Sequence, residues 1–120
     1  MTIFKTCAAA LLLSWSPFLL AGKADVIDAT LSPSGESYRV SATVKHADEG
    51  WDHYADAWRI VTADGTVLGT RELAHPHVNE QPFTRSLSGV VIPNQIGEVF
   101  IEARDSVHGW GGKRVMLTVE

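Results

Sequence analysis

Apolar and polar residues alternate with a period of two along most of the chain after residue 24, and no segment has the spacing of an amphipathic helix. In the clearest case, Tyr38, Val40, Ala42 and Val44 alternate with polar residues. A strand of this kind has one buried and one solvated face. The pattern predicts seven strands, at residues 25–31, 38–45, 54–63, 66–73, 84–92, 98–107 and 113–120.

The pair Asp64-Gly65 between the third and fourth of these strands is the signal for a two-residue, type I′ hairpin loop. With these two residues in the loop, Trp58 is expected opposite Arg71. The same register places residues 52–54 opposite residues 75–77, at the separation of directly paired side chains. The hairpin therefore predicts that Asp52, His53, His75 and His77 share one small region.

Seven short antiparallel strands in about 100 residues predict an all-β, immunoglobulin- or fibronectin-like sandwich. Trp58 is expected in its core, because sandwiches of this class often bury a tryptophan in the third strand. The glycines of the segment 109–112 are expected to form the turn before the last strand.

The first 24 residues have the order of a secretory signal peptide. A basic start at residues 1–5 precedes a mostly apolar run at residues 6–20 and a group of small residues that ends at Ala24. We expect cleavage after Ala24, with cleavage after Ala21 as the second choice, which leaves one domain at residues 25–120. An uncleaved membrane anchor is the alternative, but the run is short for a bilayer. The expected location is the periplasm.

Composition narrows the class of protein further. The 120 residues are 45% hydrophobic and 20% charged, which is typical of a compact domain. Loss of Lys5 and Lys23 with the leader changes the net charge from −4 to −6, so nucleic acid is not an expected partner. The single cysteine, Cys7, also leaves with the leader, so neither disulfides nor thiolate ligands remain.

All five histidines lie in or beside three connections that an antiparallel sandwich brings to one end, at residues 46–53, 75–82 and 108–112. Imidazole is the commonest metal ligand in proteins, and with carboxylates it suits Cu(II) or Zn(II). We therefore expect a divalent metal site at this end. Its leading ligands are His75, His77 and His53, and the further candidates are His46, His108, Asp52 and Glu80. Asp48, Asp52 and Asp56 are candidates for holding the ring N–H groups.

Two other interpretations remain open. The histidines can form a surface cluster without a metal, or the end of the sandwich can be a metal-free accessory module that binds another exported protein or peptide. In the second case the aromatic anchors are Trp51 and Trp110. The positions of Arg59, Arg71 and Arg85 favour an ion-pair network over anion capture. An enzyme is not expected, because the sequence has no nucleophile elbow, mature cysteine or phosphate-binding loop, although a histidine-metal hydrolase stays open.

The strings Gly50–Asp56 (GWDHYAD) and His75–Arg85 (HPHVNEQPFTR) resemble those of a family of small, exported bacterial proteins. This resemblance covers nearly all of residues 36–120 and implies export and a single domain. The expected sandwich with exposed histidines is also broadly similar to periplasmic copper-carrier domains of the CopC type. Those domains use a histidine at the mature N-terminus, whereas cleavage after Ala24 leaves Asp25 there.

Overall fold

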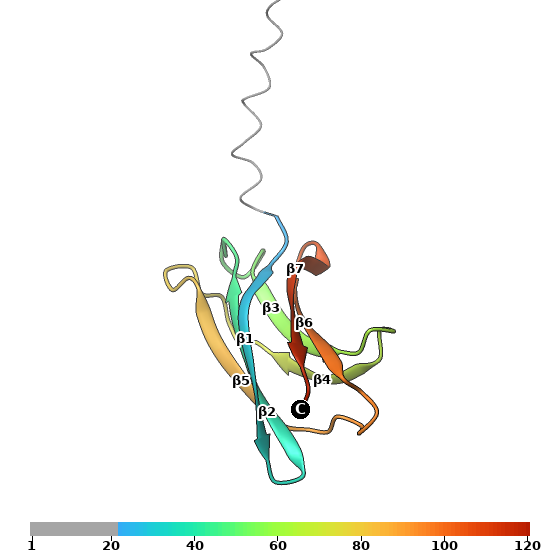
Figure 1. Cartoon of the computed structure of the whole chain (residues 1–120). Helices are drawn as coiled ribbons and strands as arrows, with labels where there is room; N and C mark the ends of the chain where they lie inside the picture. Colours follow the sequence, from blue (N-terminus) through green and yellow to red (C-terminus); the bar gives the residue numbers. More distant parts are fainter. Residues whose placement is uncertain (1–21) are drawn as a thin grey trace, which may run out of the picture.

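The computed structural model describes residues 22–120, so the expected leader at residues 1–24 lies outside the described residues except for its last three. Seven strands follow one another along the chain (Figure 1). They are β1 (Asp25–Ser34), β2 (Ser37–Lys45), β3 (Ala55–Val61), β4 (Val67–Glu72), β5 (Phe83–Val90), β6 (Glu98–Asp105) and β7 (Gly109–Thr118).

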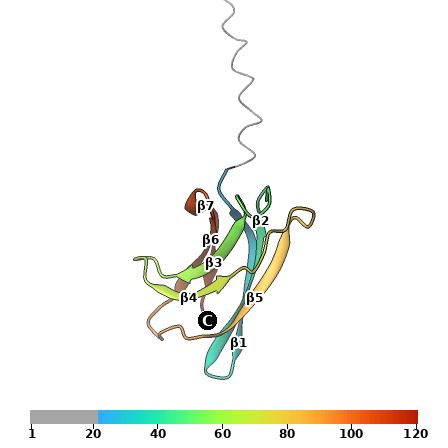
Figure 2. The ribbon, with the colours of Figure 1, turned by 180° about the vertical axis from the view of Figure 1, so that it is seen from behind.

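The strands form two antiparallel sheets that pack as a sandwich. One sheet has the order β1-β2-β5 and the other the order β4-β3-β6-β7. Figures 1 and 2 show the two layers from opposite sides, with the chain passing from one sheet to the other between β4 and β5. The predicted all-β sandwich of seven strands is confirmed.

The core lies between the facing sides of the two sheets and consists of the alternating apolar residues. Trp58, Ile60 and Ile101 on one sheet and Val40 and Val44 on the other have no exposed surface. Burial of such side chains gives about 1.5 to 3 kcal/mol each relative to exposure. The period-two pattern therefore identified the residues that hold the sheets together, and Trp58 packs in the core as expected.

The β3–β4 hairpin differs from the sequence prediction in its loop. The backbone N–H of Thr62 donates to the carbonyl of Thr66 at 2.9 Å, so three residues lie between the closing pair, and Gly65 has a φ of 91°. The carboxylate of Asp64 accepts hydrogen bonds from both threonine hydroxyls, which favours this longer loop. The two-residue type I′ loop was wrong.

The register beyond that loop is nevertheless the predicted one. An irregularity between Ile60 and Val61 offsets the extra loop residue, and Trp58 pairs with Arg71. However, β3 begins at Ala55 and β4 ends at Glu72, so residues 52–54 and 75–77 lie outside the strand pairing. The hairpin therefore does not bring His53 opposite the segment 75–77.

The turn before β7 also lies earlier than expected. β6 ends at Asp105, whose carboxylate accepts hydrogen bonds from the backbone N–H groups of Val107 at 2.8 Å and His108 at 2.7 Å. These bonds close the turn over residues 106–108, and β7 starts at Gly109. The glycine-rich segment 109–112 is thus part of a strand and is not the turn.

Three connections and the start of β1 meet at the same end of the sandwich (Figure 1). The connections are residues 46–54, 73–82 and 106–108, and together they carry all five histidines. Among residues 22–120, no helix is long and apolar enough to cross a membrane.

Candidate metal centre

His46 follows β2 directly and is held at three points. Its backbone N–H donates to the side-chain oxygen of Gln81 at 3.0 Å, and its ring Nδ1 lies 2.7 Å from Oδ1 of Asp48. Asp48 also accepts the backbone N–H groups of Ala55 and His77, at 3.0 and 2.7 Å. The third contact is made by ring Nε2, which lies 3.0 Å from the carbonyl oxygen of Gly22. A carboxylate at Nδ1 is the usual partner of an imidazole that binds a metal through Nε2.

His53 has the same arrangement on the β2–β3 connection. The backbone N–H of Glu49 donates to the carbonyl of His53 at 2.8 Å, and the Glu49 carboxylate lies 2.9 Å from the ring Nδ1 of His53. The Nε2 atom of His53 is buried, has no hydrogen-bond partner among the described residues, and lies 3.3 Å from Oδ1 of Asp105. A buried ring nitrogen without a partner is costly unless a ligand uses it.

Asp105 is the buried anion toward which both rings point, with 1% of its surface exposed. Burial alone raises its pKa, but hydrogen bonds from the backbone of His108 and Val107 and from the His108 ring outweigh that effect and hold the pKa below the usual 3.8. His108 Nδ1 lies 3.1 Å from both carboxylate oxygens. Asp105 is therefore an anion at neutral pH, and His108 orients it.

One ligand atom each from His46, His53 and Asp105 lies within 4.8 Å of the others. The two imidazole rings meet edge to face, with centroids 4.7 Å apart. Two atoms bound to one ion at about 2.1 Å lie about 3 to 4 Å apart, so small side-chain movements bring these donors to one ion. We call His46, His53, Asp105 and His108 the inner cluster; two imidazoles and a carboxylate are a donor set that suits Zn(II) and Cu(II).

His75 and His77, which we call the outer pair, lie on the β4–β5 connection with ring centroids 4.6 Å apart. The ring of His77 stacks on Phe83 at 4.0 Å, and its Nε2 accepts a hydrogen bond from the Arg85 guanidinium at 2.9 Å. Burial lowers the pKa of His77 below 6.5, and the positive charge of Arg85 lowers it further. The lone pair of His77 is thus already used, and a cation stands where a metal would approach.

The structure divides the predicted ligands between these two groups. It brings His53 to His46 and His108, and it does not bring His53 to the outer pair. Asp52 is exposed, and Glu80 lies 3.9 Å from both His77 Nε2 and Arg85. Of the carboxylates expected to hold ring N–H groups, Asp48 holds His46, whereas Asp56 pairs with Arg104 at 2.8 Å.

Sequence analysis missed Asp105 and Glu49. Asp105 was assigned to the last residues of a longer strand, 98–107, where a carboxylate has no evident role. Its signal was the spacing Asp105-Ser106-Val107-His108, in which an Asx side chain closes a short turn. Glu49 stands four residues before His53 on an irregular segment, and nothing in the alternation pattern indicated that the two side chains meet.

The two tryptophans expected to act together are separated. Trp51 is 67% exposed on the β2–β3 connection and meets the ring of Tyr54 edge to face at 5.6 Å. Trp110 lies on β7, where the guanidinium carbons of Arg59 and Arg104 stand 3.8 and 5.2 Å from its ring centroid. The two rings therefore lie on different elements and have different neighbours.

Two of the three arginines expected in an ion-pair network lie near a carboxylate. Arg59 pairs with Glu102 at 2.6 Å, and Arg85 lies 3.9 Å from Glu80. Arg71 instead donates to the backbone carbonyl of Ser86 at 3.2 Å and so links the two sheets.

Comparisons with known proteins give a fold relative and a sequence relative. No family model matches the chain. A curated protein of Halomicrobium mukohataei, named "Putative lipoprotein", is 39% identical over 99 residues. The match covers 82% of this chain but 48% of that protein, so the chain spans about half the length of the relative.

A solved structure of a hypothetical protein from Pyrococcus horikoshii aligns with a TM-score of 0.54 at 12% identity. The alignment covers 83% of this chain and 92% of that one. At this identity the likeness is one of fold. The chain is thus an all-β sandwich with a buried histidine-carboxylate group that could hold a metal. It is similar in architecture to the Pyrococcus horikoshii protein and in sequence to the Halomicrobium mukohataei protein.

Proposed function

We propose that this protein is exported to the periplasm and binds a divalent transition metal, Cu(II) or Zn(II), at His46, His53 and Asp105. One observation carries the proposal: both imidazoles are oriented by a carboxylate at Nδ1, while their Nε2 atoms converge on a buried carboxylate. Oriented imidazoles of this kind are typical of metal sites. The proposed role is binding, with no catalytic step.

Export is supported by the order of residues 1–24 and by the name of the relative from Halomicrobium mukohataei, a lipoprotein. A bound metal would also offset the free-energy cost of burying polar groups at this site. Asp105 is a buried anion, and His53 Nε2 is a buried atom with no hydrogen-bond partner within residues 22–120. A bound cation compensates both, since a buried charge is tolerated when it is paired or coordinates a metal.

The test is metal stoichiometry and affinity of the purified exported protein. We expect one Cu(II) or Zn(II) per chain in the wild type and at least about a hundredfold weaker binding in Asp105→Asn, because a ligand loss should exceed the 10- to 100-fold effect of an outer-shell loss. Fe(II) belongs in the same panel, because two histidines and a carboxylate also suit that ion.

The matched control is the double variant His75→Ala/His77→Ala, which removes the outer pair and leaves the inner cluster intact. It should bind metal as the wild type does. Loss of binding in this control, together with retained binding in Asp105→Asn, would move the site to the outer pair and contradict the proposal.

A second candidate function, binding of another exported protein or peptide, is favoured by the 67% exposure of Trp51 beside the inner cluster. Exposed tryptophans of this kind serve as interface anchors. Crosslinking in the periplasm tests it: a specific partner should be captured by the wild type and lost with Trp51→Ala. Capture that depends on Trp110→Ala instead would contradict a role for Trp51, because Trp110 is covered by two arginines.

A further inference from the structure

Gly22, Lys23 and Ala24 belong to the fold, although the sequence pattern assigned them to the leader. Ala24 is fully buried and is part of the apolar core. Its backbone carbonyl lies so close to Gly112 that a Cβ added there would stand 2.1 Å from the oxygen. Gly112 also has a φ of +72°, which favours glycine. Only glycine at position 112 of β7 leaves room for the backbone of Ala24.

The residues on either side of Ala24, Lys23 and Asp25, also contact β7. A Cβ added at Gly111 would stand 2.6 Å from the side chain of Lys23, and Asp25 accepts the backbone N–H of Lys113 at 2.7 Å. Cleavage after Ala24 would remove Lys23 and Ala24 with their contacts and would leave the charged amino group of Asp25 beside the core. The packing thus favours a cleavage site N-terminal to Gly22, and Ala21 is the small residue immediately before it.

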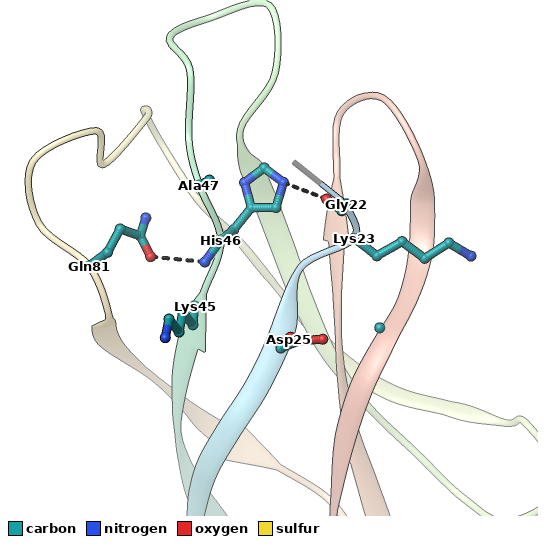
Figure 3. A pocket seen from close by; sticks show the side chains of 8 residues that line it. Gly22, Lys23, Asp25, Lys45, His46, Ala47 and Gln81 are labelled. Carbon is teal, nitrogen blue, oxygen red and sulfur yellow. Dashed lines mark hydrogen bonds between the residues drawn. The ribbon is translucent and has the colours of Figure 1, made fainter. Parts of the chain in front are cut away.

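Gly22 also reaches the inner cluster. Its carbonyl oxygen lies 3.0 Å from Nε2 of His46, the pair joined by a dashed line in Figure 3, and the same Nε2 lies 3.8 Å from Asp105. This contact is a hydrogen bond in which Nε2 donates to the Gly22 oxygen, while Asp48 accepts from Nδ1. An ion that replaced the Nε2 proton would face one lone pair from Nε2 and one from the Gly22 oxygen. Two donors about 2.1 Å from one ion and at right angles lie about 3 Å apart, which is the spacing seen here.

From these contacts we propose that the exported chain is cut after Ala21, and that the new amino terminus of Gly22 joins His46, His53 and Asp105 as a metal ligand. The amino nitrogen and carbonyl oxygen of one residue close a five-membered chelate ring on the ion. A cavity of about 630 Å³, bordered by Gly22, Lys45, His46 and Gln81, gives the ion an approach from solvent. This inference rests on the metal-binding function proposed above.

The processing step is a hydrolysis by a signal-peptide-removing protease. Water adds across the Ala21–Gly22 peptide bond: its oxygen goes to the carbonyl carbon of Ala21, and the nitrogen of Gly22 leaves as a free amine. That bond change matters for the site, because an amide nitrogen has no lone pair to give to the ion, whereas an amine does.

The first measurement is the N-terminal sequence and intact mass of the protein recovered after export of the full precursor. We expect Gly22 as the first residue. A chain that begins at Asp25, or at any residue after Gly22, would overturn the inference whatever its metal content.

The second measurement compares Cu(II) and Zn(II) affinity in two forms of the chain that begins at Gly22: the free form and a form acetylated enzymatically at the terminal nitrogen, which spares the lysines. We expect acetylation to weaken binding at least about a hundredfold, because loss of a ligand should exceed the 10- to 100-fold effect of losing a partner that only orients a ligand. Equal affinity of the two forms would overturn the amine as a ligand.

Asp105→Asn in the same background distinguishes the two proposals. If Asp105→Asn abolishes binding and acetylation has no effect, the metal site stands and the amino terminus is not part of it. If the free form binds neither ion, both the metal site and the ligand role of Gly22 are wrong, while the N-terminal sequence still decides the cleavage site.

Discussion

The two histidine groups at one end of the sandwich contain the same side chain in opposite surroundings. In the inner cluster, carboxylates hold Nδ1 of His46 and His53, and the Nε2 atoms face Asp105. In the outer pair, His77 stacks on a phenylalanine and its Nε2 faces the Arg85 cation. Proximity of histidines is therefore weak evidence for a metal site. What an imidazole can bind depends on two things: the group that holds its Nδ1 atom and the charge that faces its Nε2 atom.

Asp48 is the residue that the two groups share, and its loss should have the largest effect. In Asp48→Ala, the N–H groups of Ala55, His77 and the His46 ring lose their common acceptor. Each buried donor without a partner costs about 1 to 3 kcal/mol, so we expect the free energy of unfolding to fall by about 3 to 5 kcal/mol. Urea denaturation measures it. The exposed Asp52→Ala should change stability by no more than about 0.5 kcal/mol, and equal effects of the two substitutions would contradict a bridging role.

The second largest effect is the stabilisation that a bound metal gives, which should depend on the inner cluster and not on the outer pair. At a free ion concentration of about 100 times Kd, we expect about 2.7 kcal/mol of added stability in the wild type. His75→Ala/His77→Ala should retain this gain, whereas His53→Ala should lose it. Denaturation with and without Zn(II) measures it. A gain that disappears with the outer pair and persists in His53→Ala would reverse the comparison.

The carboxylate that orients His53 should have a smaller effect. Glu49→Gln removes the anion from the ring Nδ1 but keeps an acceptor, and the side chain is largely exposed, with 59% of its surface accessible. We expect metal affinity to fall about tenfold, the low end for loss of an outer-shell partner. Calorimetric titration provides the measurement. Glu80→Gln, beside the outer pair, is the control and should leave affinity unchanged; a comparable loss there would show a nonspecific charge effect.

The smallest effect concerns the pH dependence of the outer pair. The pKa of folded His77 lies below the unfolded value of 6.5, so the unfolded chain binds more protons between those two values. His77 therefore contributes stability above pH 6.5 that is lost as pH falls toward its folded pKa. The slope cannot exceed about 1.4 kcal/mol per pH unit for one proton. His77→Gln should flatten the decline measured between pH 7.5 and 5 most. His75→Gln should flatten it less, because the charge of His75 is only a smaller cause of the lowered His77 pKa; identical slopes in all three proteins would contradict this origin.

Some features of the site followed from local sequence rules and some did not. Trp58 pairs with Arg71 as the hairpin predicted, but only because an irregularity between Ile60 and Val61 offsets the extra residue of the loop. The hairpin rule failed for His53 and His75 because both strands end before those residues. The connections are joined instead by Asp48, whose carboxylate accepts the backbone N–H of His77, 29 residues away in the chain. The same carboxylate holds the ring of His46, two residues away.

By itself, the sequence determined the class of fold, the residues of the core and the end of the molecule that collects the histidines, because these depend on alternation and on chain reversal at each connection. Only the tertiary structure decided which imidazoles share a carboxylate. That choice depends on irregular loops, on the turn that buries Asp105, and on the packing of Gly22–Ala24 against β7. Such contacts join residues far apart in the chain, and no periodic pattern records them.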